Sequence, residues 1–140
     1  MFKRPNWQVG FGVQNKYSNG MRQSPDVSAF ATSLAGYFQG QWGIFGGTSF
    51  ATPIWASGLA LVNEGMLEQS QSFFFGPDLF YVVAQTGTSD NLHPYFDITQ
   101  GNNLYYSATK GWDYATGFGT PNLSVFSQTL LARASNKSNT

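Results

Sequence analysis

The stretch FGGTSFATPIWASGLALVNEG, residues 45–65, joins a glycine-rich turn to a long, uncharged and mostly apolar run. From Ser49 to Glu64 the pattern is helical, and apolar side chains fall on several faces, which is typical of a helix buried nearly all round. Pro53 is tolerated only within the first turn of such a helix, and Gly65 is a suitable residue to end it. The stretch therefore predicts a central core helix that begins beside an accessible serine.

The composition predicts a folded chain with a neutral surface. The 140 residues are 41% hydrophobic and 10% charged, with seven basic and seven acidic side chains, whereas an average soluble domain has roughly 25% charged residues. Such sparse charge would suit an acidic medium, because few ion pairs are lost when carboxylates protonate. No basic stripe is present for phosphate contacts, so we expect no nucleic acid as a partner.

The absence of certain residue types and apolar runs excludes several kinds of functional site and targeting segment. The chain has no cysteine, which rules out disulfides, thiolate metal sites and a cysteine nucleophile. No apolar signal segment follows the basic residues of the N-terminus, and no run of about 18 apolar residues occurs. We therefore expect neither an export signal nor a membrane anchor in this chain.

Turn and capping signals predict the other elements. Residues 1–24 have an irregular, loop-like composition, and so do residues 86–119. We expect a domain over residues 1–133 and a polar, frayed tail over 134–140. The predicted elements are a strand over PDVSAF (25–30), two strands about Gly40 within 36–45, a helix opening at Pro77, and a helix with Thr120 as N-cap, Pro121 as its first residue and Leu123, Phe126 and Leu130 on one stripe.

Ser49 at the start of a helix permits two interpretations. Unpaired N–H groups and the positive end of the helix dipole stabilise an oxyanion there, and Gly46 and Gly47 let a substrate approach closely. This arrangement suits acyl transfer. In the alternative, Ser49 or Thr48 merely caps the helix.

Five segments in the same order resemble the sedolisins, the serine-carboxyl peptidases. GGTSFATPIWASGLALVNE resembles their active-site block G-T-S-x-x-x-P, with Ser49 and Pro53 at the matching positions. RQSPDVSA (22–29) looks like the family's R-x-x-P-D-V-S-A segment. The remaining similar segments, within a match that spans residues 2–122, are FKRPNWQ upstream and FDITQGNN and KGWDYATGFGTPN downstream.

The resemblance implies a fold and an activity. The fold would be α/β, a subtilisin-like three-layer parallel sheet with flanking helices, of which only the C-terminal portion is present. The activity would be acid-active hydrolysis of peptide bonds in a peptide or protein substrate, through an acyl-enzyme on Ser49. A full-length member would be extracellular. Subtilases use a similar serine block with a histidine base, but His93, the single histidine, follows the serine, and we expect it to have a structural or surface role.

Asp97 and Asp113 lie beside glycine-rich turns, where such residues more often form Asx-turns. The resemblance assigns them instead to a loop that binds one Ca²⁺, an ion that prefers oxygen ligands. The ligands it implies are the side chains of Asp97 and Asp113 and the carbonyls of Ile98, Thr109 and Gly111. Thr109 stands where the family often has glycine, which matters only if the position needs a positive φ.

The acidic part of the site is missing from this chain. Sedolisins use a glutamate base, an aspartate that orients it and an oxyanion-hole aspartate, all on segments before the region matched here. Asp26 is the one acid before Ser49, and it matches none of the three. We expect an isolated chain that is inactive, exposes apolar surface and needs the N-terminal half in cis or as a separate chain. The alternatives are a non-catalytic calcium-binding remnant, a subtilase-like fragment and, least favoured, a sugar-binding module.

Overall fold

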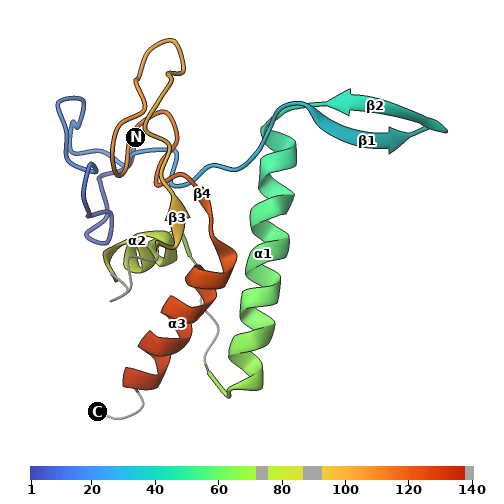
Figure 1. The fold of residues 1–140 in the computed structure, drawn as a ribbon. Coiled ribbons are helices and arrows are strands. Elements are labelled where there is room, and N and C mark those ends of the chain that lie inside the picture. The colour runs from blue at the N-terminus through green and yellow to red at the C-terminus, as the bar shows by residue number, and fades with distance from the viewer. Residues whose placement is uncertain (72–75, 87–92, 138–140) are drawn as a thin grey trace.

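The computed structural model describes residues 1–71, 76–86 and 93–137. Positions 87–92 of the expected loop and 138–140 of the expected tail lie outside these ranges. The elements, shown in Figure 1, are β1 (Leu34–Phe38), β2 (Gln41–Phe45), α1 (Thr48–Glu68), α2 (Asp78–Gln85), β3 (Tyr95–Phe96), β4 (Thr120–Pro121) and α3 (Leu123–Lys137). Within the described part of the chain the strands form two antiparallel pairs, β1 with β2 and β3 with β4, and no parallel pair.

Helix α1 is longer and more exposed than the sequence predicts. It continues through Gly65 to Glu68, so Gly65 is not its end. Pro53 lies inside the helix, beyond the first turn in which we expected it. The buried residues form a single stripe, so the expected burial on all sides is also wrong: this stripe consists of Trp55, Gly58, Val62 and Met66.

The core joins the buried stripe of α1 to the helices α2 and α3 and extends to Val13, Trp112 and Phe118 on the loops. Aromatic rings fill it, with Trp55 5.1 Å from Phe80 and 5.8 Å from Phe126 between ring centroids. Gly58 allows α3 to approach, because a Cβ there would lie 2.6 Å from a methyl carbon of Leu123. This packing places α1 and α3 side by side, as Figure 1 shows.

The segment PDVSAF does not form a strand. It runs alongside residues 117–119, where the Phe118 N–H donates to the Asp26 carbonyl at 2.9 Å and the Ser28 N–H donates to the Gly119 carbonyl at 3.0 Å. Two backbone hydrogen bonds join the segment to this stretch, and no ladder forms. A Cβ on Gly117 would lie 2.2 Å from the Asp26 carbonyl oxygen, so this contact requires glycine.

The two strands predicted about Gly40 are confirmed as the hairpin of β1 and β2. Gln39 and Gly40 form its turn with φ angles of 49° and 81°, and Leu34 pairs with Phe45 at the open end. Positive φ at both central residues is the geometry that suits a two-residue hairpin loop. Figure 1 shows the hairpin extending away from the helices.

The helix predicted at Pro77 is confirmed as α2, which has Pro77 as its N-cap. The start predicted for the last helix is wrong. Thr120 and Pro121 pair with β3 instead, and α3 begins at Leu123, with the Phe126 N–H donating to the Asn122 carbonyl at 2.9 Å. The helix continues to Lys137, so residues 134–137 of the expected frayed tail are helical. Phe126 and Leu130 are buried on its inner side, as the stripe predicted.

We expect Gly117→Ala to destabilise the fold more than Gly20→Ala. Both glycines have a positive φ, 62° and 78°, so each change carries about 1–2 kcal/mol of backbone strain. Only Gly117 also faces a backbone oxygen, whereas a Cβ on Gly20 would meet nothing within 4 Å. Overpacking should lower the free energy of unfolding by about 2 kcal/mol beyond the Gly20 variant, measured by urea denaturation. Equal losses would show that the contact with Asp26 contributes nothing.

Candidate functional site

Ser49 lies exposed in the first turn of α1. The N-cap is Gly47, whose φ of 139° is readily adopted only by glycine. No side-chain oxygen caps this helix. The interpretation of Ser49 or Thr48 as a cap is therefore wrong, and the first N–H groups of the helix lack side-chain acceptors.

Two glycines hold the serine turn close to the chain before β1. The Gly47 N–H donates to the Ala31 carbonyl at 2.7 Å, and a Cβ on Gly46 would lie 3.2 Å from the same oxygen. The Ser49 hydroxyl oxygen lies 3.3 Å from where a Cβ on Gly47 would be. Side chains at these positions would crowd both the turn and the hydroxyl.

Pro53 removes one backbone hydrogen bond near the start of α1. A residue at this position normally donates its N–H to the carbonyl four residues earlier, which here belongs to Ser49. Proline has no N–H, so the Ser49 carbonyl lacks that helical donor. Beside Ser49 the Phe50 N–H donates to the Gly47 carbonyl at 3.0 Å, so the atom left without its usual helical partner is the Ser49 carbonyl.

Within residues 1–71, 76–86 and 93–137, no base accompanies the Ser49 hydroxyl. None of the hydrogen bonds of the described residues involves the Ser49 side chain, and no group of three or more His, Cys, Asp or Glu side chains gathers within those residues. Asp26 pairs with Arg22 and Tyr81. His93 is exposed beside β3. The described structure thus exposes the Ser49 hydroxyl without a neighbouring group that would accept its proton.

Asp97 and Asp113 approach one loop segment from two sides. Asp97 Oδ2 accepts the Gly111 N–H at 2.8 Å, and Asp113 Oδ2 accepts the Thr109 N–H at 2.8 Å. Asp113 is 3% exposed, and its Oδ1 accepts the N–H groups of Ala115 and Thr116, both at 2.8 Å. Asp113 thus forms the Asx-type turn that its sequence context suggests, while Asp97 stays exposed.

The donor set of this loop fits a Ca²⁺ ion. Two carboxylates flank residues 109–111, and the carbonyls of Ile98, Thr109 and Gly111 accept no hydrogen bond from the described residues. Thr109 is not among the residues with positive φ, so threonine is not strained there. Gly111 has a φ of 79°, and a Cβ on it would lie 2.4 Å from the Phe11 ring. These oxygens match the ligand chemistry of calcium.

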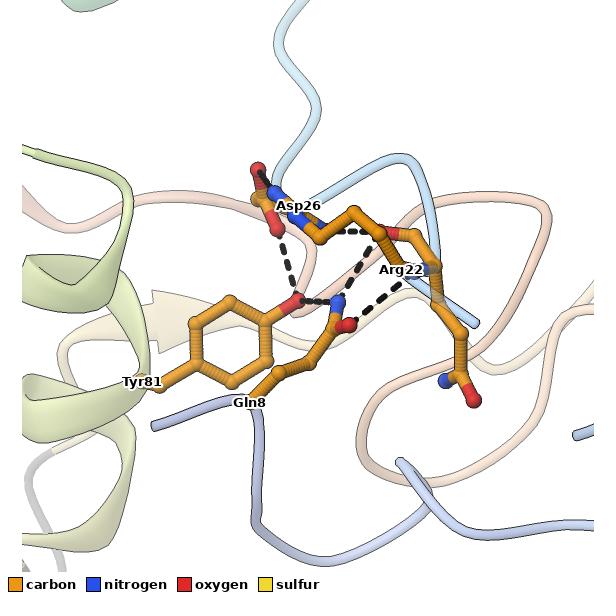
Figure 2. A network of polar contacts seen from close by, with 5 residues as sticks. Gln8, Arg22, Asp26 and Tyr81 are labelled. Atoms are coloured by element: carbon orange, nitrogen blue, oxygen red, sulfur yellow. Dashed lines mark hydrogen bonds and ion pairs between the residues drawn. The ribbon is translucent and has the colours of Figure 1, made fainter. Parts of the chain in front are cut away.

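A polar network that sequence reasoning missed ties the N-terminal segment to α2 (Figure 2). The buried Gln8 side chain donates from Nε2 to the Tyr81 hydroxyl at 2.7 Å, and the hydroxyl donates to Asp26 Oδ1 at 2.6 Å. Arg22 pairs with Asp26 Oδ2 at 2.6 Å. The spacing of Arg22 and Asp26 was visible in the sequence, but their partners on distant segments were not.

Tyr81 is held in its neutral form by this network. Burial raises the pKa of its hydroxyl well above the ordinary value, and the hydrogen bond to Asp26 raises it further. Burial also raises the pKa of Tyr95. Both hydroxyls therefore act as donors, Tyr81 to Asp26 and Tyr95 to the Phe80 carbonyl at 2.8 Å.

Comparison with known proteins finds peptidases. The chain is 33% identical to tripeptidyl-peptidase 1 of Dictyostelium discoideum over 86% of its length and 30% identical to kumamolisin of Bacillus sp. over 96%. Its structure matches Pseudomonas sedolisin, a serine-carboxyl proteinase complexed with pseudo-iodotyrostatin, with a TM-score of 0.76, 31% identity and 95% of the chain covered. This match confirms the predicted subtilisin-like fold class, while the strands in the described part of the chain pair only in the antiparallel sense.

These matches cover only part of each relative. The chain spans 22% of the Dictyostelium protein, 25% of kumamolisin and 35% of the sedolisin chain. No family profile matches it. None of the described helices is both long and apolar enough to cross a membrane.

We expect Tyr81→Phe to lower the free energy of unfolding at neutral pH. The variant should also change how steeply this free energy falls with pH in the alkaline range. Without the hydroxyl, buried Gln8 and Asp26 lose a partner, which should cost about 1–3 kcal/mol. In the wild type, the unfolded state releases the Tyr81 proton near pH 10 while the folded state retains it, so stability falls as pH rises through that window. The free energy of unfolding of the variant, measured by urea denaturation, should fall less steeply with pH above about 10. An equally steep fall in both proteins would contradict the raised pKa of Tyr81 in this network.

Proposed function

Because this chain belongs to the sedolisin family and spans about a fifth to a third of the relatives it matches, we propose that it is the nucleophile-bearing part of a serine-carboxyl peptidase active in acid. The substrate is a peptide or protein. The observation that carries the proposal is the exposed Ser49 hydroxyl at a helix start whose N–H groups no side chain caps.

The proposed reaction begins with attack of the Ser49 oxygen on the carbonyl carbon of the scissile bond. The serine proton passes to a glutamate carboxylate, and the tetrahedral oxyanion is stabilised by N–H groups near the helix start and by a protonated aspartate. Collapse breaks the C–N bond, the amine leaves with a proton, and the acyl group remains as an ester on Ser49. Water then hydrolyses the ester and returns the proton to the serine.

The glutamate and aspartates come from the N-terminal half of the domain, supplied in cis or as a partner chain. A carboxylate base remains available in acid, where a histidine base would already be protonated. The isolated chain is therefore inactive, because a serine without a positioned base is a weak nucleophile. The full-length protein works outside the cell. Acid conditions suit this chain, because Arg22–Asp26 is the one ion pair among its described residues.

The loop around Asp113 holds one Ca²⁺ in this proposal. The ligands are the carboxylates of Asp97 and Asp113 and the carbonyls of Ile98, Thr109 and Gly111. The ion supplies positive charge that offsets the two carboxylates and orders the loop after β3. Asp97 and the Gly111 N–H already bring the loop from residue 97 against residue 111.

A second candidate is a calcium-binding structural remnant without catalysis. The observation that favours it is the absence of any carboxylate bonded to Ser49 within the described residues. A subtilase-like mechanism would instead need His93 as the base, and no hydrogen bond in the described structure joins these two side chains. Complementation with the missing half separates the candidates.

We expect Ser49→Ala to remove turnover from the complemented protein, meaning this chain co-expressed with the part of Pseudomonas sedolisin that it does not match. Loss of the nucleophile should lower kcat by about 1,000-fold or more at acid pH, measured with an acid-denatured protein substrate. Ser57→Ala, which changes an exposed serine two turns further along α1, is the matched control. Full activity in the Ser49 variant, or activity that peaks near neutral pH and needs His93, would disprove the assignment.

We expect Asp97→Asn to weaken Ca²⁺ binding of the complemented protein by about tenfold or more, which corresponds to about 1.4 kcal/mol. Asp97 is the suitable position because it is exposed and accepts a single hydrogen bond, so the loop should survive its substitution. Calorimetric titration measures the affinity, and Glu64→Gln on α1 is the acid-to-amide control. Binding that is unchanged in the Asp97 variant would exclude this ligand set.

A further inference from the structure

One face of the β1–β2 hairpin presents only apolar side chains to solvent. The register pairs Ala35 with Ile44 and Tyr37 with Trp42, so these four residues share a face, which we call the hairpin face. Tyr37, Trp42 and Ile44 are 63%, 76% and 72% exposed. The rings of Tyr37 and Trp42 meet edge-on at 5.4 Å, which gives the face a continuous aromatic surface.

The opposite face of the hairpin is partly covered by its own side chain, although Phe38 on that face is 64% exposed. The Phe45 ring lies over Gly36 and Gly43, since a Cβ at these glycines would lie 2.8 Å and 3.2 Å from ring carbons. An isolated two-stranded hairpin is marginally stable in water and normally requires packing on one side. The hairpin face carries three large exposed side chains, Tyr37, Trp42 and Ile44, that remain available for that packing.

The surroundings of the hairpin face carry no charge. From Val27 to Asn63 the chain has no Asp, Glu, His, Lys or Arg. The Phe45 ring lies 6.2 Å from that of Phe50, which connects the hairpin to the start of α1. On the outer side of α1, Leu61 is exposed as well. A partner of this surface must therefore be apolar itself, because charged groups would find no counterpart.

We propose that the hairpin face is the docking surface for the remaining part of the sedolisin-type domain. This inference rests on the proposed function. The structural match covers 95% of this chain but 35% of the sedolisin chain, so most of that chain has no counterpart here and is available to cover the surface. A partner with large uncharged area fits better than a lipid surface, whose headgroups would meet no basic residue between 27 and 63.

Docking at the hairpin face acts directly on the serine turn. β1 begins shortly after Ala31 and β2 ends at Phe45, two residues before Gly47. The hydrogen bond of 2.7 Å from the Gly47 N–H to the Ala31 carbonyl closes the base of the hairpin. A partner that fixes the hairpin therefore also fixes the backbone that positions Ser49.

The test is co-purification of this chain with the unmatched part of Pseudomonas sedolisin. Trp42→Ala should reduce the amount of complex at least tenfold, because exposed tryptophan at an apolar interface is a frequent energetic hot spot. Ile44→Ser is the second variant and should act in the same direction. Phe2→Ala removes an aromatic ring that is 85% exposed in the N-terminal segment and should leave the complex unchanged. Circular dichroism of each variant chain confirms that it folds.

Ser49→Ala distinguishes this inference from the proposed function. The variant should bind like the wild type, whereas its activity should be lost. A complex that forms equally well with Trp42→Ala and Ile44→Ser would overturn the docking surface and leave the role of Ser49 standing. The docking surface would also be overturned if the wild-type chain formed no complex. The same holds if this chain formed a dimer that the Trp42→Ala variant no longer forms. A stable complex without Ser49-dependent activity would instead count against the proposed function.

Discussion

The indole of Trp55 joins most parts of the structure, and the direction of the helix that carries Ser49 depends on it. Its N–H donates to the Ser28 carbonyl at 2.8 Å, which connects α1 to the segment before the hairpin. Its ring lies 5.1, 6.2 and 5.8 Å from Phe80, Tyr95 and Phe126 on α2, β3 and α3. A tryptophan serves here because one residue fills an apolar core and still satisfies a buried carbonyl. Since Trp55 follows Ser49 by less than two helical turns, this contact also fixes the serine.

The two carboxylates of the proposed calcium loop, Asp97 and Asp113, have different structural roles. Asp113 is buried, and its carboxylate already accepts three backbone N–H groups and the Thr116 hydroxyl. A carboxylate offers about four lone-pair directions, so a cation would share Asp113 with the turn that it builds. Asp97 is exposed and accepts one N–H from Gly111. Asp113 therefore organises the loop through its own hydrogen bonds, and Asp97 has the greater capacity left for an ion.

The sequence predicts the elements whose geometry is decided by a few neighbouring residues. It does not predict the elements that depend on partners far away in the chain. The hairpin about Gly40 and the opening of α2 at Pro77 follow from turn and proline geometry within a few residues. The start of α3 was misplaced because Thr120 and Pro121 pair with β3. The segment PDVSAF looked like a strand because it is extended, but its partner is the glycine-rich stretch 117–119. The position of Ser49 came from the motif, while its lack of a capping bond required the structure.

In the proposed enzyme, one body, the N-terminal half of the domain, both covers the hairpin face and completes the site at Ser49. Figure 1 shows the hairpin leaving the molecule at the end of α1 where Ser49 lies, so a partner that covers the hairpin also reaches the serine. The region from Val27 to Asn63 has no group that titrates in acid. Apolar docking there keeps the same strength as the pH falls, because no charge on this side changes. In the proposed mechanism, acid pH therefore sets the protonation of the carboxylate that accepts the serine proton without weakening the contact that brings this carboxylate to Ser49. The proposed assembly and the proposed catalysis would thus differ in their pH dependence, although they use neighbouring residues.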